Sequence, residues 1–174
     1  MSTSPPSVAQ GVTSVGGLVF SGAFDSGRLG RVRCVEPDCF EVTLLADGEE
    51  DGVAANDYRV WYFFSVAGGA PGRTVRITIV NLNVIAKVYN RDLRPLVRVL
   101  ARSPTWERLE QRCGFRVTPR QELQLSFEYT FLPAAGGGSA AAPTAHFAYY
   151  YPFSYGDDQR LLDNVERVLA GRRC

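Results

Sequence analysis

The segment from Leu123 to Phe131 constrains the fold more than any other part of the sequence, because apolar and polar side chains alternate along it. The apolar positions are Leu123, Leu125, Phe127, Tyr129 and Phe131, and the polar positions are Glu122, Gln124, Ser126, Glu128 and Thr130. Successive side chains of a β-strand point to opposite faces of the sheet. This period of two therefore predicts a strand with one buried face.

Further strands are predicted from similar patterns. Tyr58 to Val66 carries apolar side chains on both faces, which is typical of a central strand covered on both sides. Arg73 to Asn81 alternates valine and isoleucine with threonine and arginine. Gly30 to Val35 and Phe40 to Leu45 alternate more weakly.

Glycine and proline separate these predicted strands. Gly68 to Gly72 joins two strong strands by a short loop, so we expect a hairpin there. Pro133 to Pro143 is rich in alanine and glycine and is expected to form a flexible loop. Residues 1–16 are expected to form a flexible tail, and residues 17–171 one domain, as suits a chain of 174 residues.

One helix is well marked, from Asp157 to Ala170. Acidic residues stand near its start and arginines near its end, and Gly171 would end it. Its apolar stripe consists of Leu161, Leu162, Val165, Val168 and Leu169. A shorter helical or irregular piece is expected from Ser103 to Arg112. Together these elements predict a mainly β fold, an antiparallel β-sandwich with one C-terminal α-helix.

Charge and terminal composition exclude several classes of partner. The formal net charge is +1, and no recognised nucleic-acid motif accompanies the arginines, so we expect no nucleic-acid partner. The first ten residues lack the basic start and apolar stretch of a secretory signal. No stretch approaches the length needed to cross a bilayer. We therefore expect a soluble, non-secreted protein without a membrane partner, whose four cysteines need not be bridged.

Residues suited to catalysis or metal binding are scarce. A catalytic zinc site needs three protein ligands, usually histidines and a carboxylate, and His146 is the single histidine. Cys34 and Cys39 could clamp a metal or form a disulfide, but no second pair supplies further ligands. We expect no catalytic residue, no metal site and no cofactor in this chain.

The sequence Asp25-Ser26-Gly27 superficially suggests a serine nucleophile, but a triad needs a base, and His146 would have to meet the serine by chance. The same three residues are typical of a turn. In that turn Asp25 and Ser26 would cap backbone amides, and Gly27 would take a positive φ.

A dense group of aromatic residues surrounds Pro152. The segment from Phe147 to Gln159 reads F-A-Y-Y-Y-P-F-S-Y-G-D-D-Q. A strand that begins near Thr144 should end at Tyr151, because proline cannot donate to a sheet ladder. Aromatic rings with polar tips suit a half-buried seam. We call residues 147–159 the aromatic corner.

The aromatic corner resembles the signature that closes the N-terminal domain of cytosolic carboxypeptidases, enzymes that trim glutamates from tubulin. Phe24 to Leu29, F-D-S-G-R-L, and Trp61 to Val66, W-Y-F-F-S-V, resemble two other motifs of this family. Arg28 stands where the family usually has asparagine. Four further pieces agree in order, and the whole resemblance, nearest to the subgroup that removes branch-point glutamates, covers roughly Leu18 to Leu169. The four pieces are Gly68 to Gly72, Ile79 to Asn83, Tyr89 to Pro95 and Trp106 to Arg108.

The resemblance implies a non-catalytic N-terminal β-domain that supports or docks a catalytic domain. Zinc is expected only in that second domain, since the family's H-x-x-E pair is absent here: Tyr149 stands three residues after His146. Phe24, Asp25, Ser26 and Gly27 would form a turn, which we call the motif turn. The implied interdomain or partner surface consists of Tyr151, Pro152, Phe153, Ser154, Tyr155, Asp158 and Gln159.

A second interpretation stays open, in which the chain is a stand-alone structural or binding module on tubulin or microtubules. It would be cytoplasmic and could associate with the cytoskeleton, the cilium or the axoneme. Arg91 to Arg120 is locally basic, and Arg94, Arg98 and Arg102 could meet an acidic partner such as a glutamylated tubulin tail. A solvated basic face is the alternative. The lack of catalytic residues disfavours a self-sufficient hydrolase.

Overall fold

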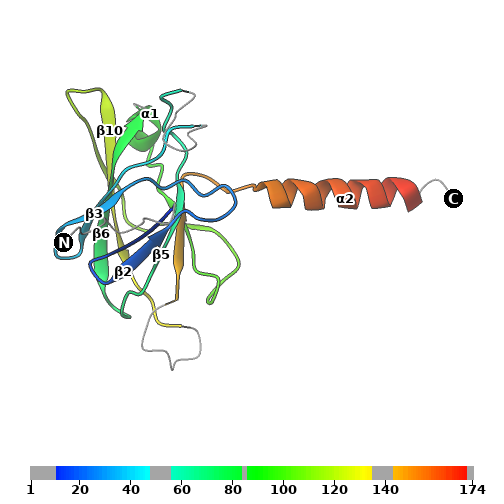
Figure 1. Ribbon diagram of the computed structural model, residues 1–174, viewed down its shortest axis with the longest axis horizontal. Helices are drawn as coiled ribbons and strands as arrows, with labels where there is room; N and C mark the ends of the chain where they lie inside the picture. The colour runs from blue at the N-terminus through cyan, green and yellow to red at the C-terminus, as the bar shows by residue number, and fades with distance from the viewer. Residues whose placement is uncertain (1–10, 48–55, 84–85, 135–142, 172–174) are drawn as a thin grey trace, which may run out of the picture.

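Two β-sheets pack face to face, and one long helix projects away from them (Figure 1). The computed structural model describes residues 11–47, 56–83, 86–134 and 143–171. The mainly β sandwich with a C-terminal helix is therefore confirmed. Among the described residues, no helix is both long enough and apolar enough to span a membrane.

The first sheet has six strands and the second has five. In spatial order the first contains β1 (Val12–Val15), β2 (Leu18–Ser21), β5 (Phe63–Ala67), β11 (Ala145–Ala148), β7 (Leu96–Arg98) and β8 (Glu107–Arg108). The second contains β3 (Val32–Glu36), β4 (Cys39–Val42), β6 (Thr74–Asn83), β10 (Glu122–Thr130) and β9 (Gly114–Val117). The named strands pair antiparallel except β4 and β6, which run parallel. The helices are α1 (Ala86–Asn90), which the sequence pattern did not predict, and α2 (Tyr155–Gly171).

Strand β10 has the alternating burial that its sequence predicts. Leu123, Leu125, Phe127 and Tyr129 are buried, and Phe131, just past the end of the strand, is buried as well. The strand pairs with β6 on one side and β9 on the other, so it lies inside the second sheet. Its apolar face points toward the first sheet, since Phe127 and Tyr129 contact Phe147 of β11.

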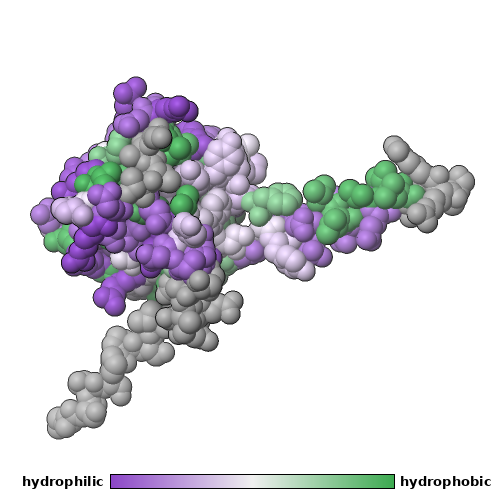
Figure 2. Space-filling model, turned by 90° about the horizontal axis from the view of Figure 1, so that it is seen from above, coloured by the Kyte–Doolittle hydropathy of each residue, from purple (hydrophilic) through white to green (hydrophobic). Residues whose placement is uncertain are grey.

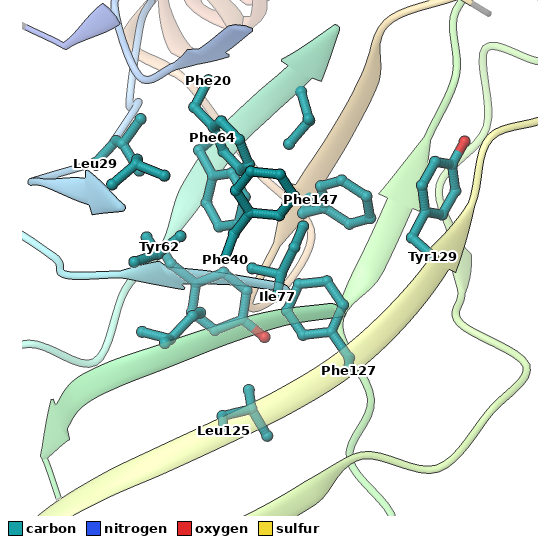
Figure 3. Close-up of a cluster of buried hydrophobic side chains, with 14 of the residues drawn as sticks. Phe20, Leu29, Phe40, Tyr62, Phe64, Ile77, Leu125, Phe127, Tyr129 and Phe147 are labelled. Atoms are coloured by element: carbon teal, nitrogen blue, oxygen red, sulfur yellow. The ribbon is translucent and has the colours of Figure 1, made fainter. Parts of the chain in front are cut away.

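Aromatic rings fill the space between the two sheets (Figure 3). Phe147 on β11 lies at the centre of this group, with ring centroids 5.7 Å from Phe64, 5.4 Å from Phe127 and 5.0 Å from Tyr129. Phe64 belongs to the same sheet as Phe147, whereas Phe127 and Tyr129 belong to the opposite sheet. The ring of Phe147 therefore joins the two layers.

The strand predicted from Tyr58 to Val66 is shorter than expected. Only β5 is a strand, and its position between β2 and β11 confirms that it is central and covered on both faces. Tyr58 is 63% exposed and lies outside the core. The residues before β5 bond to the last residue of β6, which belongs to the other sheet. Asn83 N–H donates to Arg59 O at 3.0 Å, and Arg59 N–H donates to the Asn83 side chain.

The hairpin predicted at Gly68 to Gly72 is wrong, because β5 and β6 lie in different sheets. The loop crosses from one layer to the other. Gly68 and Gly72 take positive φ, and a Cβ on Gly69 would lie 2.4 Å from the ring of Phe131. Glycine is needed here for close approach to a core ring as well as for the turn.

Two other boundaries differ from the sequence expectation, and one segment takes the second of its two expected forms. Part of the predicted tail, Val12–Val15, forms β1 by pairing with β2. The piece from Ser103 to Arg112, expected to be helical or irregular, is irregular apart from the short strand β8. The last strand ends at Ala148, before Tyr151, and one further backbone bond, from Tyr149 N–H to Tyr62 O, follows it. Most of the loop predicted at 133–143 lies outside the described residues.

Helix α2 has the predicted apolar stripe, but the stripe is not buried. Leu161, Leu162, Val165, Val168 and Leu169 are between 46% and 56% exposed. Figure 2 shows them as a green band along the helix, well away from the sandwich. The β-core is complete without α2.

We expect Phe147→Ala to destabilise the sandwich by about 3–5 kcal/mol, because it removes a ring from the contact between the sheets and leaves a cavity. Phe153→Ala is the matched control, since Phe153 is 62% exposed and should cost far less. Urea unfolding of both variants measures the difference. Equal losses would show that the ring of Phe147 does not join the layers.

Candidate functional site

The aromatic corner and the motif turn, far apart in the sequence, meet at the N-terminus of α2. The backbone N–H of Gly156 donates to Asp25 Oδ2 at 3.0 Å, across 131 residues of chain. Residues of both segments, together with Trp61, also line an open cleft of about 480 Å³. The cleft residues are Ser26, Gly27, Arg28, Trp61, Tyr151 and Phe153. This junction is the candidate site.

The motif turn is held by its own backbone and by β5. Gly27 N–H donates to Phe24 O at 2.8 Å, and Arg28 N–H donates to Phe63 O at 2.7 Å. The positive φ expected at Gly27 occurs at Ser26 instead, where φ is 63°. Gly27 is required for a different reason: a Cβ there would lie 2.1 Å from the carbonyl oxygen of Gly22.

The two polar side chains of the motif turn act differently. Asp25 accepts from a backbone amide, but that amide belongs to Gly156 at the other end of the domain and not to the turn itself. Ser26 does not cap a backbone amide: its hydroxyl donates to Asp25 Oδ1 at 3.2 Å, while its carbonyl accepts the Trp61 indole N–H at 2.9 Å. The bond from Gly156 is the largest cause of a lowered pKa at Asp25, against an opposing contribution from desolvation. The Asp25 carboxylate is thus held in its charged form.

Helix α2 begins with a capping box that the sequence analysis missed. Asp157 N–H donates to Ser154 Oγ at 3.2 Å, and Ser154 N–H donates to Asp157 Oδ2 at 2.9 Å. Bonds from the Ser154 backbone, the Ser154 hydroxyl and Arg160 lower the pKa of Asp157 to about 2. Helix residues therefore start at Tyr155, two residues earlier than predicted. The spacing of serine and an acid three residues later is the signal that could have revealed this start.

Three aromatic side chains of the corner that are expected to meet a partner are exposed to solvent. Tyr151 is 53% exposed, Phe153 62% and Tyr155 71%. Pro152 is partly buried, and Asp158 and Gln159 lie partly exposed in the first turns of α2. The surface expected to meet a partner is therefore accessible.

Beneath the corner, a second aromatic cluster covers the outer face of the first sheet. The Phe63 ring lies 4.7 Å from Phe24, 6.3 Å from Trp61 and 5.6 Å from Trp106. His146 lies 5.7 Å from the Phe24 ring, and its pKa is lowered, mainly by burial and also by the charge of Arg98. These contacts give His146 a packing role.

Arg108 links the end of β11 to neighbouring backbone. Its guanidinium donates to Arg94 O and, at 3.4 Å, to Tyr149 O. It also lies 5.4 Å from the ring centroid of Tyr150. The corner is therefore held at two places, by Arg108 before Pro152 and by Asp25 after it.

Each of the three arginines predicted to meet an acidic partner contacts its own chain. Arg94 donates to Glu110 O at 2.7 Å and lies 3.7 Å from the Asp92 carboxylate. Arg98 lies over the Trp106 ring at 4.4 Å. Arg102 donates to Pro133 O at 2.6 Å. The acidic-partner patch stays a prediction.

Within the described residues, no group of three or more His, Cys, Asp or Glu side chains could hold a metal ion. Cys34, Cys39 and Cys113 are free thiols, so the disulfide considered for Cys34 and Cys39 does not form. Burial raises the pKa of Cys113 to about 11.

We expect Ser154→Ala to weaken the first turn of α2 by about 1 kcal/mol, because the N-cap acceptor is lost. Hydrogen exchange of the first α2 amides should quicken, and the pKa of Asp157, measured by carboxyl NMR, should rise part of the way toward its ordinary value. Ser14→Ala, at an exposed position of β1, is the control. Unchanged exchange in the Ser154 variant would contradict the capping box.

Comparison with known proteins agrees with this geometry. The family model described as the cytosolic carboxypeptidase N-terminal domain matches residues 20–150. The human cytosolic carboxypeptidase-like protein 5 is 36% identical over 181 residues, covering 87% of this chain and 19% of the relative. Human cytosolic carboxypeptidase 6 is 27% identical over 155 residues, covering 87% of this chain and 28% of the relative. The chain thus spans about a fifth of the length of the protein 5 relatives.

Solved structures share the fold. A metallo-carboxypeptidase from Burkholderia cenocepacia matches with a TM-score of 0.58 at 17% identity, covering 86% of this chain and 33% of that one. A metallo-carboxypeptidase from Pseudomonas aeruginosa matches with a TM-score of 0.56 at 19% identity, covering 87% and 33%. The family model covers most of the described β-sandwich and stops just before α2. The chain belongs to the cytosolic carboxypeptidase family, in which it corresponds to the N-terminal domain.

Proposed function

We propose that this chain is a non-catalytic domain that docks and supports the catalytic domain of a metallocarboxypeptidase. The observation that carries the proposal is the exposed apolar stripe of α2, which continues from the exposed aromatic corner. A helix with one apolar face ordinarily buries that face against another element. Here the described β-sandwich does not cover it.

The energy available from covering α2 is considerable. Full burial of a leucine or valine side chain contributes about 1.5–3 kcal/mol, and the five stripe residues are already about half buried. Covering the remainder would contribute several kcal/mol, on the order of 5, before the costs of association. Adding Tyr151 and Phe153 enlarges the apolar area. A surface of this composition supports a permanent intramolecular interface better than a solvated face.

In this proposal zinc and the catalytic residues belong to the docked domain. The substrate class follows the family resemblance, namely glutamate chains on tubulin, nearest to branch-point removal, in the cytoplasm. Arg28, in the cleft beside the corner, departs from the usual asparagine of the family. Nothing in the cleft assigns it a substrate role.

The docking proposal predicts that the reading frame beyond Cys174 encodes an H-x-x-E motif and a distant histidine. In that longer product, Val165→Asp should lower the thermal unfolding temperature and zinc-dependent glutamate release, because a charge enters the apolar interface. Asn164→Asp, one residue away on the helix, is the matched control. An immediate stop codon, or a Val165 variant as active and stable as the control, would contradict the proposal.

A second candidate is a tubulin- or microtubule-binding module, which would place the chain at the cytoskeleton, the cilium or the axoneme. The observation in its favour is that several arginines of the basic stretch are exposed, namely Arg91, Arg102, Arg112, Arg116 and Arg120. Such charges could attract an acidic tail at low salt. Their separation over strands and loops supports a weak contact.

The second candidate predicts co-sedimentation with glutamylated microtubules that weakens with salt. Replacing the exposed Arg91, Arg102 and Arg112 together by glutamine should reduce the bound fraction, whereas Arg33→Gln on the second sheet should not. Binding that is equal with tail-free microtubules, or insensitive to the triple replacement, would refute a tail contact.

A further inference from the structure

Helix α2 projects alone from the β-sandwich, so its direction must be set where it begins (Figure 1). We infer that Asp25 is a positioning residue: its carboxylate, bonded to the N–H of Gly156 at 3.0 Å, fixes the direction in which α2 leaves the sandwich. This role does not depend on which partner covers the helix.

The capping box cannot set that direction. Its bonds join Ser154 to Asp157, and both residues belong to the segment that begins the helix. Such bonds stabilise the first turn, but they would rotate with the helix as one body. The bond from Gly156 to Asp25 is different, because Asp25 belongs to the β-sandwich side of the junction.

The position of Asp25 is itself well determined. On one side, the Phe24 ring packs on Phe63 at 4.7 Å. On the other, Arg28 pairs with Phe63 through a backbone bond of 2.7 Å, and Ser26 O accepts the Trp61 indole N–H. Phe63 and Trp61 belong to β5 and the residues just before it. The carboxylate is therefore held in place relative to the first sheet.

The chemistry of the contact also suits this role. The first N–H groups of a helix lack partners within the helix, and the helix dipole favours a negative charge there. A carboxylate supplied from outside the helix satisfies both conditions. The motif turn and the aromatic corner, which lie at opposite ends of the domain sequence, thus form one joint. The motif turn supplies the carboxylate of Asp25, and the aromatic corner supplies the N–H of Gly156 that donates to it.

A fixed direction has a consequence for binding. A helix that is already oriented loses less conformational freedom when a partner covers its apolar face than one that swings freely. Asp25 would then favour docking without touching the partner. Its loss should change the orientation of α2 and leave its helicity intact, whereas loss of the Ser154 cap should do the reverse.

The test is to measure residual dipolar couplings of backbone amides in the 174-residue chain. In the wild type, couplings of α2 should fit the same alignment tensor as those of β6 and β10. In Asp25→Ala the α2 couplings should shrink by about half or more, as expected for a segment that has become mobile, while helix content stays unchanged. Asp25→Asn, which keeps an acceptor but loses the charge, should fall between the two.

Two controls separate positioning from simple loss of structure. Ser154→Ala should shorten the helix at its start without changing the alignment of the rest. Glu128→Gln removes an acid on the second sheet, where it pairs with Arg76, and should leave α2 couplings unchanged. If Asp25→Ala fails to fold, the α2 couplings of Asp25→Asn provide the test. Wild-type α2 couplings that need a separate tensor, or Asp25 variants that keep wild-type couplings, would overturn the inference.

Discussion

The ring of Phe147 lies between the two sheets and is the contact that joins them. It packs against Phe64 in its own sheet and against Phe127 and Tyr129 in the other. Strand β11 is thereby held between β5 and β7. Phe147 is also the first residue of the aromatic corner, and the strand ends one residue later, so the corner begins in the core.

The corner is then connected to the sandwich by polar contacts of longer range. Arg108 reaches Tyr149 O, and Asp25 accepts from Gly156. Trp61 adds a bond to Ser26, so segments near residues 25, 61 and 155 share one small region. These are the same segments that carry the family resemblance. Their meeting gives that resemblance a physical explanation, because the matching residues build one joint.

The two outer surfaces of the molecule differ in a way that bears on function. The outer face of the second sheet is covered by paired polar side chains: Arg33 Nε donates to Glu41 at 2.7 Å, Arg76 pairs with Glu128 at 2.8 Å, and Thr78 bonds Ser126 at 2.7 Å. The polar groups of this face have partners within the domain. The apolar stripe of α2 and the exposed rings of the corner instead leave apolar area in contact with water. The difference supports the proposal that a partner domain covers the corner and α2 and leaves the second sheet free.

Local features of this protein could be predicted from the sequence, because they depend on neighbours along the chain. Apolar residues with a period of two predict β10, and apolar residues with a period of 3.6 predict α2. The three-residue spacing of Ser154 and Asp157 is typical of a helix start. Contacts between distant residues could not be predicted in this way. Whether Gly68 to Gly72 closes a hairpin or crosses between sheets depends on the partners of β5, and the exposure of the Val165 stripe depends on where α2 points. The bond between Asp25 and Gly156 exists only because folding brings two ends of the domain together, and a periodic pattern carries no information about such a pair.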